Sequence, residues 1–362
     1  MPLLSSAGRA ACHGRRDAAY REEVRGRWAN LALVVLVPAA ALSGVGLFLV
    51  GSGPVWLVAV LHAGLGLGPL ALVPWKKPVV QRGLRRMRPG RSTSLVLTWV
   101  LLAAVLSGLL HLVGLTGQWL AVTTMQLHVT AGVLAAVITV VHAVQRPVRV
   151  RRPDWGRRTL LRTGGVAVVA AGLGVGAITT GAALARAGDR RSTGSFRLDD
   201  DEVPVTQWFL DTVPTVDPQA WRLTVVSPLG ERRLSLADLA GGDEVTAALD
   251  CTGGWWAEPT WSGTRLVRLL PEVDRELSVV VTSSTGYARR LPLTDDLLLA
   301  TSMGGSPLTA GHGAPVRLVV PGRRGYHWVK WVERVEVHED PDPGAVASTV
   351  WSSFTAAGRG AA

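Results

Sequence analysis

The fold of the second half of this chain depends on two stretches, LDCTGGWW at residues 249–256 and HGAPVRLVVPGRRGYHWVKW at residues 312–331. The first contains Cys251, and the only other cysteine, Cys12, lies in the polar N-terminal tail. A disulfide framework within this half is therefore excluded. A lone cysteine is most often a small buried hydrophobe, but its thiolate is also a soft, anionic metal ligand. The residues alone leave both interpretations of Cys251 open.

The composition points to membrane helices. Hydrophobic residues make up 48% of the 362 residues and charged residues only 18%, which is unusual for a soluble globular protein. Residues 1–185 carry 20 Lys and Arg against 4 acids, whereas residues 186–362 carry 18 against 23. The positive charge lies at the ends of apolar stretches, as in cytoplasmic loops, rather than clustered on one folded domain. Nucleic-acid binding is therefore excluded as the function.

The first half contains apolar segments that are long enough to cross a hydrocarbon layer of about 30 Å at about 1.5 Å per residue. They cover residues 28–50, 55–75, 95–115, 119–144 and 160–184. The sequence predicts a cytoplasmic tail over residues 1–27 and a five-helix transmembrane domain over residues 28–185. Four of the helices would form a bundle like that of a cytochrome b, and the fifth would link this bundle to the second half of the chain.

The loops predict the orientation of these helices. Residues 76–91 contain seven basic residues and no acid, and residues 145–158 contain six basic residues and one acid. The positive-inside rule places both loops and the N-terminus in the cytoplasm, so residues 186 onward lie outside. We expect a multi-pass protein of the plasma membrane. The pair Arg157 and Arg158 resembles an internal twin-arginine export signal, or is simply further cytoplasmic charge. A-x-A patterns at residues 183–187 are possible cleavage sites, but retention as an anchor is simpler.

The second half is predicted to be a mixed α/β domain. A polar linker covers residues 186–202, the domain itself residues 203–338, and a flexible Pro-, Gly- and Ala-rich tail residues 339–362. Runs with strand character, separated by Gly and Pro turns, occur at residues 221–226, 277–282, 316–320 and 332–337.

The two quoted stretches resemble the molybdenum-binding core of the sulfite oxidase family, which includes the periplasmic methionine-sulfoxide reductase catalytic subunit. LDCTGGWW is similar to the block around the metal ligand, and residues 312–331 follow the pattern H-G-x-P-x-R…P-G…G-x-x-x-V-K-W. The resemblance covers about residues 203–338, and two long motifs in the same order make it specific. It implies a molybdopterin-binding fold, a molybdenum–molybdopterin cofactor and oxidoreductase activity.

The resemblance also implies roles for individual residues. Cys251 would be the catalytic thiolate ligand of molybdenum. The second block would bind the cofactor. His312, Arg317 and Lys330 would donate to the anionic pterin, and Gly322 and Gly325 would let the backbone approach it closely. Extra cations nearby, for which solvated surface charge is the favoured interpretation, are Arg289, Arg290, Arg323 and Arg324.

The substrate is constrained by a departure from the family pattern. Sulfite-oxidising members place an arginine a few residues after the metal cysteine, whereas this chain has Gly253, Gly254, Trp255 and Trp256 there. The resemblance therefore favours the reductase side, with a neutral oxide such as a sulfoxide as substrate. Trp255, Trp256 and Trp261 are either an apolar roof over the metal or ordinary core aromatics.

Histidines in the apolar segments predict a second cofactor. His62 and His128 come seven and nine residues after their segments enter from the outer side, so they lie at similar depth. Matched depth suits bis-histidine ligation of a haem b, and histidines that only hydrogen-bond between helices are the alternative. His142 has no partner at its own level, and His111 could replace either ligand or line a quinone pocket.

Together these features predict a membrane-anchored molybdopterin-dependent oxidoreductase that catalyses two-electron oxygen-atom transfer outside the cytoplasm. Its electrons would be exchanged with the membrane quinone pool, or with a redox partner, through the haem. Two alternatives remain. The same site could run oxidatively as a sulfite-type dehydrogenase, or the chain could be a non-catalytic membrane protein that retains the fold.

Overall fold

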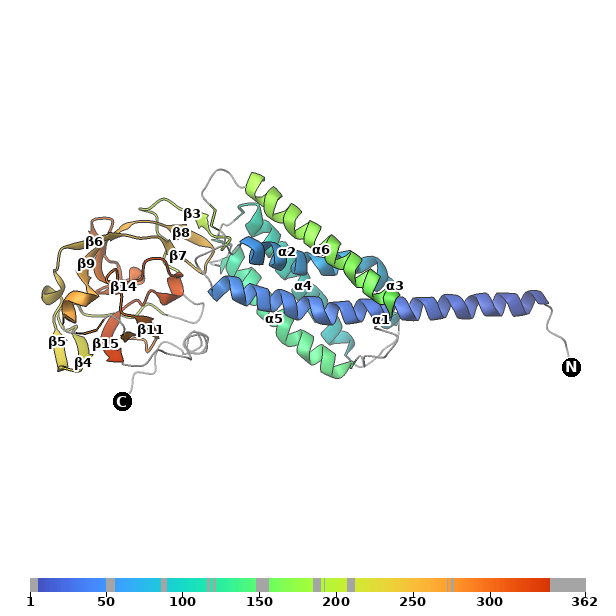
Figure 1. Ribbon diagram of the computed structural model, residues 1–362, viewed down its shortest axis with the longest axis horizontal. Helices are drawn as coiled ribbons and strands as arrows, with labels where there is room; N and C mark the ends of the chain where they lie inside the picture. Colours follow the sequence, from blue (N-terminus) through green and yellow to red (C-terminus); the bar gives the residue numbers. More distant parts are fainter. Residues whose placement is uncertain are drawn as a thin grey trace. The chain divides into compact units, whose positions relative to one another are not determined.

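The computed structural model describes most of the chain as two compact units. The described residues are 6–49, 56–85, 90–115, 118–119, 122–147, 156–184, 190–191, 193–206, 212–271, 273–274 and 277–338. One unit is helical and comprises residues 1–48 and 54–188; the other contains the sheets and comprises residues 49–53 and 189–362 (Figure 1).

The helical unit contains six described helices and one short hairpin. Their bounds are α1 Ser6–Leu49, α2 Trp56–Ala71, α3 Val73–Arg85, α4 Arg91–Leu112, β1 Gln118–Trp119, β2 Val122–Thr123, α5 Thr124–Gln145 and α6 Arg157–Leu184. Four described stretches are long and apolar enough to cross a membrane, namely Trp28–Leu49 in α1, Arg91–Leu112, Thr124–Gln145 and Leu161–Leu184 in α6. Helix α2 is apolar but only 16 residues long. The sequence had predicted five such spans.

The helix in the expected span 119–144 begins later than predicted, at Thr124. Thr123 is its N-cap: the Gln126 N–H donates to the Thr123 hydroxyl over 3.1 Å, and the Thr123 N–H donates to the Gln126 side chain over 2.8 Å. This reciprocal pair satisfies two N–H groups that the first helical turn leaves without partners. The preceding residues form the hairpin of β1 and β2 instead.

The outer faces of the helices are apolar, and their contacts use glycine. Val35, Trp99 and Val144 are 66%, 70% and 76% exposed, which suits contact with lipid. A Cβ on Gly64 of α2 would lie 2.5 Å from a backbone oxygen of α6, and one on Gly174 of α6 would lie 2.3 Å from a backbone oxygen of α2. Small residues thus allow these two backbones to touch, as in membrane helix pairs.

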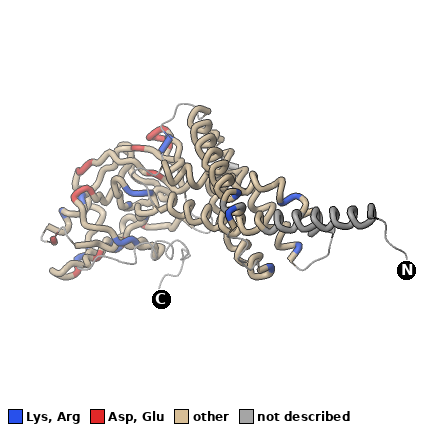
Figure 2. The backbone as a smooth tube through the Cα atoms, turned by 45° about the vertical axis from the view of Figure 1, so that its right-hand side comes forward, with Lys and Arg blue, Asp and Glu red and all other residues tan. Residues whose placement is uncertain are grey.

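Charge is distributed differently in the two units. Figure 2 shows Lys and Arg but no Asp or Glu in the coloured part of the helical unit, and residues of both charge signs in the sheet unit. This distribution agrees with the expected difference between an apolar, basic first half and a mixed second half.

The described residues of the second unit form three sheets. The strands are β3 Phe196–Arg197, β4 Leu223–Ser227, β5 Gly230–Leu234, β6 Asp243–Thr246, β7 Leu249–Asp250, β8 Trp255–Ala257, β9 Thr260–Arg265, β10 Ser278–Ser283, β11 Ala288–Pro292, β12 Leu298–Met303, β13 Ser306–Pro307, β14 Arg317–Val319 and β15 Val332–His338. One sheet has the order β11-β10-β15-β4-β5, the second β13-β12-β9-β6 with β14 also paired to β12, and the third β3-β8-β7. All four runs with predicted strand character are strands.

The core lies between these sheets because alternate strand residues point inward. Val279 and Val281 of β10 and Leu223 and Val225 of β4 are fully buried. The helical elements of the described part of this unit are short 3-10 helices, at Ala237–Leu239 (η2), Leu266–Leu269 (η3), Ala310–His312 (η4) and Gly325–His327 (η5). The mixed α/β domain that we expected is thus mainly a sheet domain, since its frequent Gly and Pro turns leave only short runs between strands.

Candidate functional site

Cys251 lies on a tight turn between β7 and β8. Its N–H donates to the Trp255 carbonyl over 2.9 Å, and the Gly254 N–H donates back to the Cys251 carbonyl over 3.1 Å. Gly254 has a φ of +89°, a left-handed conformation that favours glycine. The thiol is free, and the Gly253 N–H donates to its sulfur over 3.3 Å. Three hydrogen bonds and a glycine with a left-handed backbone therefore fix the position of this sulfur.

The environment of the thiol combines burial with positive charge. Burial raises the pKa of Cys251, while hydrogen bonds from the Gly253 N–H and the Thr206 side chain, and the charges of Lys330 and Arg324, act in the opposite direction. At neutral pH the metal-free sulfur therefore keeps its proton, which a metal ion would displace on binding. Once deprotonated, the thiolate would face cations and hydrogen-bond donors.

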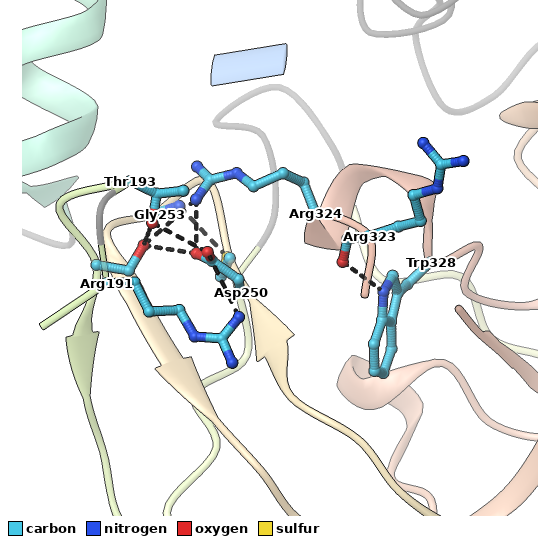
Figure 3. Close-up of polar contacts among 9 residues, drawn as sticks. Arg191, Thr193, Asp250, Gly253, Arg323, Arg324 and Trp328 are labelled. Carbon is cyan, nitrogen blue, oxygen red and sulfur yellow. Dashed lines mark hydrogen bonds and ion pairs between the residues drawn. The ribbon is translucent and has the colours of Figure 1, made fainter. Parts of the chain in front are cut away.

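Asp250, directly before Cys251, is almost completely buried and holds together two distant parts of the chain (Figure 3). Its Oδ1 accepts hydrogen bonds from the Ser195 hydroxyl and from Arg324 Nη1, both over 2.6 Å. Its Oδ2 accepts from the Thr193 hydroxyl over 2.9 Å and lies 3.9 Å from Arg191 Nη1. The residue before the candidate metal ligand is thus anchored to the segment 191–195 and to the second sequence block.

Two of the four extra arginines are not on the surface, contrary to the favoured interpretation. Arg324 and Arg289 are only 5% and 3% exposed. Arg324 is paired with the buried Asp250, and Arg289 Nε donates to the Tyr326 carbonyl over 3.0 Å. Arg323 is exposed as expected. The sequence could not show these partners because they come from strands and turns far away along the chain.

Arg317 of β14 is buried beside the aromatic core. Its Nη1 donates to the His312 carbonyl over 3.2 Å, and its guanidinium lies over the rings of Trp261 and Trp328, 5.3 and 5.7 Å from their centroids. Burial lowers the pKa of Arg317 to about 10, while the nearby Cys251 acts to raise it. The group remains cationic at neutral pH and adds positive charge near the sulfur.

Lys330 and His312 are held near the same turn by backbone carbonyls. Lys330 Nζ donates to the carbonyls of Gly311, over 2.7 Å, and Thr206, over 3.1 Å. His312 Nε2 lies 2.8 Å from the Val203 carbonyl, so it carries the proton, and Nδ1 lies 2.8 Å from a threonine hydroxyl. The structure thus brings Lys330 close to Cys251, while both ring nitrogens of His312 contact protein atoms.

The two glycines of the second block have different local functions. A Cβ on Gly325 would lie 3.2 Å from the Asp250 carbonyl oxygen and 3.3 Å from Cys251 Cα, so Gly325 allows this segment to pack against the Cys251 turn. Gly322 has a φ of +71°, and a Cβ there would meet open space. The first glycine is therefore needed for close approach and the second for its backbone conformation.

The three tryptophans near the turn are core residues. Trp255 and Trp261 belong to the buried apolar cluster of the domain, and Trp261 is fully buried. Trp256 is also buried, with the guanidinium groups of Arg191 and Arg197 at 4.3 and 4.9 Å from its ring. Their packing agrees with the interpretation as core aromatics.

Buried donors without hydrogen-bond partners indicate which kind of ligand the region around Cys251 could bind. Among the described residues, the buried side-chain N and O atoms that lack a hydrogen-bond partner are Thr139 Oγ1, Ser284 Oγ, Arg317 Nε, Arg324 Nε and His327 Nδ1. Three of them belong to the block 312–331. Burial, together with the charges of Arg289 and Arg323, lowers the pKa of His327 to about 4. Unsatisfied nitrogens on buried cations close to a thiol fit an anionic metal cofactor.

In the helical unit, the structure brings His62 of α2 and His128 of α5 together. Their Nε2 atoms are 3.5 Å apart, and their ring planes lie at 87°. His62 Nδ1 lies 3.0 Å from the Ala40 carbonyl and His128 Nδ1 lies 2.8 Å from the Ala104 carbonyl. Because a carbonyl only accepts, both Nδ1 atoms carry the proton, and in the neutral rings both Nε2 atoms carry a lone pair. Two lone pairs that face each other suit a cation between them, either a metal ion or a shared proton.

The other two helix histidines lie elsewhere. His111 is buried, and its Nδ1 lies 3.3 Å from the Thr124 hydroxyl. His142 Nδ1 lies 3.5 Å from the Ser94 hydroxyl. No cluster of three or more His, Cys, Asp or Glu side chains suited to a metal ion occurs among the described residues.

Comparisons with known proteins identify the second unit. Residues 210–346 match the family model described as oxidoreductase molybdopterin binding domain. The mitochondrial sulfite oxidase of Homo sapiens is 32% identical over 168 residues, covering 35% of this chain and 31% of the relative. The sulfite oxidase of Gallus gallus is 32% identical over 184 residues, covering 40% of each chain. This chain thus covers less than half of the length of these relatives.

Among solved structures, the sulfane dehydrogenase SoxCD from Paracoccus pantotrophus is similar, with 25% identity, coverage of 35% of this chain and 40% of that chain, and a TM-score of 0.33. The matched region contains Cys251, Arg317, Arg324 and Lys330. The chain therefore carries a molybdopterin-binding domain of the sulfite oxidase family, preceded by helices that are long and apolar enough to cross a membrane.

Proposed function

We propose that this protein is a membrane-anchored molybdopterin-dependent oxidoreductase that catalyses two-electron oxygen-atom transfer. The observation that carries the proposal is the free Cys251 thiol on its tight turn, with Arg317, Arg324 and Lys330 close by in a domain of the molybdopterin-binding family. The bound molybdenum cofactor would supply the redox chemistry. The protein would supply ligation, orientation and access.

Each residue would have a separate task. Cys251 would lose its proton and bind molybdenum as a soft anionic ligand, while the Gly253 N–H keeps its sulfur in place. The unpaired Nε atoms of Arg317 and Arg324 would donate to anionic atoms of the cofactor. Lys330, and His312 on the neighbouring 3-10 helix, would add donors after exchanging a present contact for the cofactor. Gly322 and Gly325 would serve the cofactor indirectly, by shaping the backbone around it.

We propose reduction of a neutral, sulfoxide-like oxide rather than oxidation of sulfite. Residues 253–256 are glycines and tryptophans, and Trp255 and Trp256 are buried rather than presented to a substrate. An arginine at that place, which sulfite-oxidising members of the family use for their anionic substrate, is lacking in the sequence. The alternative is the same site running oxidatively as a sulfite-type dehydrogenase.

We further propose that His62 and His128 hold the iron of a haem b, which would supply one-electron transfer within the helices. Their two Nε2 atoms would be the ligands, since each carries a lone pair in the neutral ring. These Nε2 atoms are 3.5 Å apart, and the backbone carbonyls fix the tautomer that leaves both of them available to a metal ion. A shared proton and a purely structural contact are the alternatives.

The proposed location is the plasma membrane, with the N-terminus in the cytoplasm and residues 186 onward outside. The basic bias of residues 76–91 and 145–158 supports it. A reporter fused after residue 340 should be active only outside the cytoplasm. The proposed electron partners are the membrane quinone pool or another redox protein.

The main test measures molybdenum, pterin and haem per chain in the purified protein, followed by turnover of sulfoxides, N-oxides and sulfite with a dye as electron partner. We expect one molybdenum, and faster turnover of a sulfoxide than of sulfite. A folded protein without molybdenum would contradict the proposed activity and favour a non-catalytic membrane protein. Faster turnover of sulfite would support the dehydrogenase instead.

The haem is tested separately with His62→Ala and His128→Ala. Either substitution should remove a reduced-minus-oxidised haem absorbance, whereas His142→Ala, in the same helix as His128 but away from the pair, should retain it. Dye-driven turnover at molybdenum should survive in all three variants. If the unaltered protein has no haem absorbance, the helices serve as an anchor, a quinone site or a docking surface.

A further inference from the structure

The helical unit contains a cavity of about 350 Å³, which is large enough for part of a small organic ligand. It lies where α1, α3 and the beginning of α6 come together (Figure 1). Two of the residues around it, Trp28 and Arg162, are the first and second residues of apolar stretches that are long enough to cross a membrane. The cavity therefore lies at the level where these stretches begin, which corresponds to the boundary between hydrocarbon and lipid headgroups.

One wall of the cavity is formed by two tryptophans in fixed positions. The rings of Trp28 and Trp75 are in edge-to-face contact, with their centroids 6.0 Å apart and their planes at 76°. Trp28 Nε1 donates to the Thr163 hydroxyl over 3.5 Å, and Lys76 Nζ donates to the Asn30 side-chain oxygen. These contacts connect α1 with both α3 and α6, so the helices that surround the cavity are held together.

The opposite wall is apolar and belongs to α6. It consists of Gly165, Val166 and Val169, of which Gly165 is exposed and Val169 is 50% exposed. A Cβ on Gly165 would meet no atom within 4 Å, so the space beside this glycine is open. Because these residues are also accessible from outside, a hydrocarbon chain in the surrounding membrane could enter between the tryptophans and α6.

Arg162 is the charged residue of the cavity wall, and it is only partly exposed. The described residues from Trp28 to Leu184 include no Asp or Glu that could neutralise it. A guanidinium group binds phosphate through two parallel hydrogen bonds, which makes arginine well suited to a phosphate headgroup. An apolar cavity with one cation in its wall is therefore complementary to an amphiphile with an anionic head.

A quinone, the proposed electron partner, fits this cavity less well. Oxidation of a quinol releases protons, and a site for that reaction needs a group that can accept them. The residues around the cavity, all of which are described, include no His, Asp or Glu. A quinone head is also neutral, so it would leave the charge of Arg162 uncompensated.

We propose that this cavity binds an anionic phospholipid, with the phosphate on Arg162 and an acyl chain along Gly165, Val166 and Val169. The basic segments 76–91 and 145–158 adjoin the same helix ends and would favour anionic lipid there. This binding site goes beyond the proposed function, because it would be present whether or not the protein holds molybdenum or haem.

The headgroup is tested by native mass spectrometry of the delipidated full-length protein in detergent. Dioleoyl-phosphatidylglycerol is compared with dioleoyl-phosphatidylcholine, which has the same chains but no net charge. One basic residue near a membrane surface corresponds to about fivefold in affinity for anionic lipid, so we expect at least this preference for phosphatidylglycerol. Arg162→Gln should remove the preference. Arg157→Gln, at an exposed residue of the same helix that is not part of the cavity wall, should retain it.

The acyl chain is tested by filling the cavity. Gly165→Leu should weaken the binding of both lipids, because its side chain occupies the open space beside α6. Gly176→Leu is the matched control, since this glycine of the same helix also meets no atom within 4 Å but lies away from the cavity. If Gly165→Leu does not accumulate, Gly165→Val is a smaller substitution with the same expected effect.

Three results would refute the lipid site. Equal loss of preference in Arg162→Gln and Arg157→Gln would show a general effect of basic charge. Displacement of the lipid by glycerol phosphate at equal concentration would show an anion site that does not use the cavity. Displacement by decylubiquinone, with no preference between the two lipids, would show a quinone site instead. These measurements require no molybdenum, so their failure leaves the proposed function untouched, and a protein without molybdenum leaves the lipid site untouched.

Discussion

Asp250→Asn should destabilise the sheet unit strongly, because it breaks a buried ion pair without changing its size. The side chains of Asp250 and Arg324 are 2% and 5% exposed, and their nearest atoms are 2.6 Å apart. Removal of one partner of a buried pair costs about 3–5 kcal/mol, since it leaves an uncompensated buried charge. Thr193, Ser195 and Arg324 all donate hydrogen bonds to Asp250. The NH₂ group of an Asn side chain would face at least one of these donors, and two donors cannot form a hydrogen bond with each other.

The assay is urea unfolding of the full-length protein in detergent, followed by tryptophan fluorescence. Because domains are stable by only about 5–15 kcal/mol, the expected loss should bring the midpoint to a much lower urea concentration. Glu231→Gln is the matched control: Glu231 pairs with Arg233 over 3.4 Å, but their side chains are 46% and 74% exposed. Such a surface pair contributes about 0–1 kcal/mol. A loss in Asp250→Asn no larger than in the control would refute the reasoning.

A double variant tests the cause of this destabilisation. Asp250→Leu with Arg324→Met removes both charges, and buried pairs replaced by apolar residues are often neutral in stability. The hydroxyls of Thr193 and Ser195 would still lose their acceptor, at about 1–3 kcal/mol for each buried group. The double variant should therefore recover part of the stability but not all of it.

Further predictions concern both cofactors and acid stability. Cys251→Ser should abolish molybdenum-dependent turnover while the domain stays folded, because an alkoxide is a harder and more basic ligand; retained turnover would refute the assignment. Arg317→Ala should lower pterin content at least several-fold, by removing a buried cation beside the site. Gly108→Ala should reduce haem content, because its Cβ would lie 2.9 Å from Nδ1 of His128. Gly132→Ala is the control, since its Cβ would meet open space, and it should leave haem content unchanged. The pKa of His327 is lowered to about 4 in the folded protein, so its side chain is neutral there at neutral pH. Its contribution to stability is therefore complete above about pH 6.5 and is lost as the pH falls towards 4. His327→Phe should make the urea midpoint depend less on pH over that window.

The sequence predicted those features that depend on local patterns. The apolar lengths of the segments 95–115 and 160–184 predicted the helices α4 and α6, and β-branched runs predicted β10 and β15. It predicted the span 55–75 less well, because the apolar segment is divided after Ala71 into α2 and the separate helix α3. Hydropathy measures composition and does not detect such a break.

The hydrogen-bond and ion-pair partners of the candidate site residues could not be predicted from the sequence. Arg324 resembled a surface cation, since its neighbour Arg323 is one, and its partner Asp250 lies 74 positions away. Thr206 carried no signal, because its contact with the Cys251 turn depends on folding across 45 positions. The hydroxyls of Thr193 and Ser195 likewise find their acceptor only through tertiary structure. Sequence motifs thus indicate which residues lie near the site, whereas the tertiary structure decides which hydrogen-bond partners they have.

The pairing of β3 with β8 affects where this chain can be divided. The family match begins at residue 210, but Phe196 and Arg197 pair in parallel with Trp255 and Trp256, in the segment that we expected to be a linker. A fragment that starts at the family boundary would lack that strand and three of the hydroxyls beside the Cys251 turn. Domain exchange or truncation should therefore cut before residue 190, because the unit that folds is longer than the unit that sequence similarity detects.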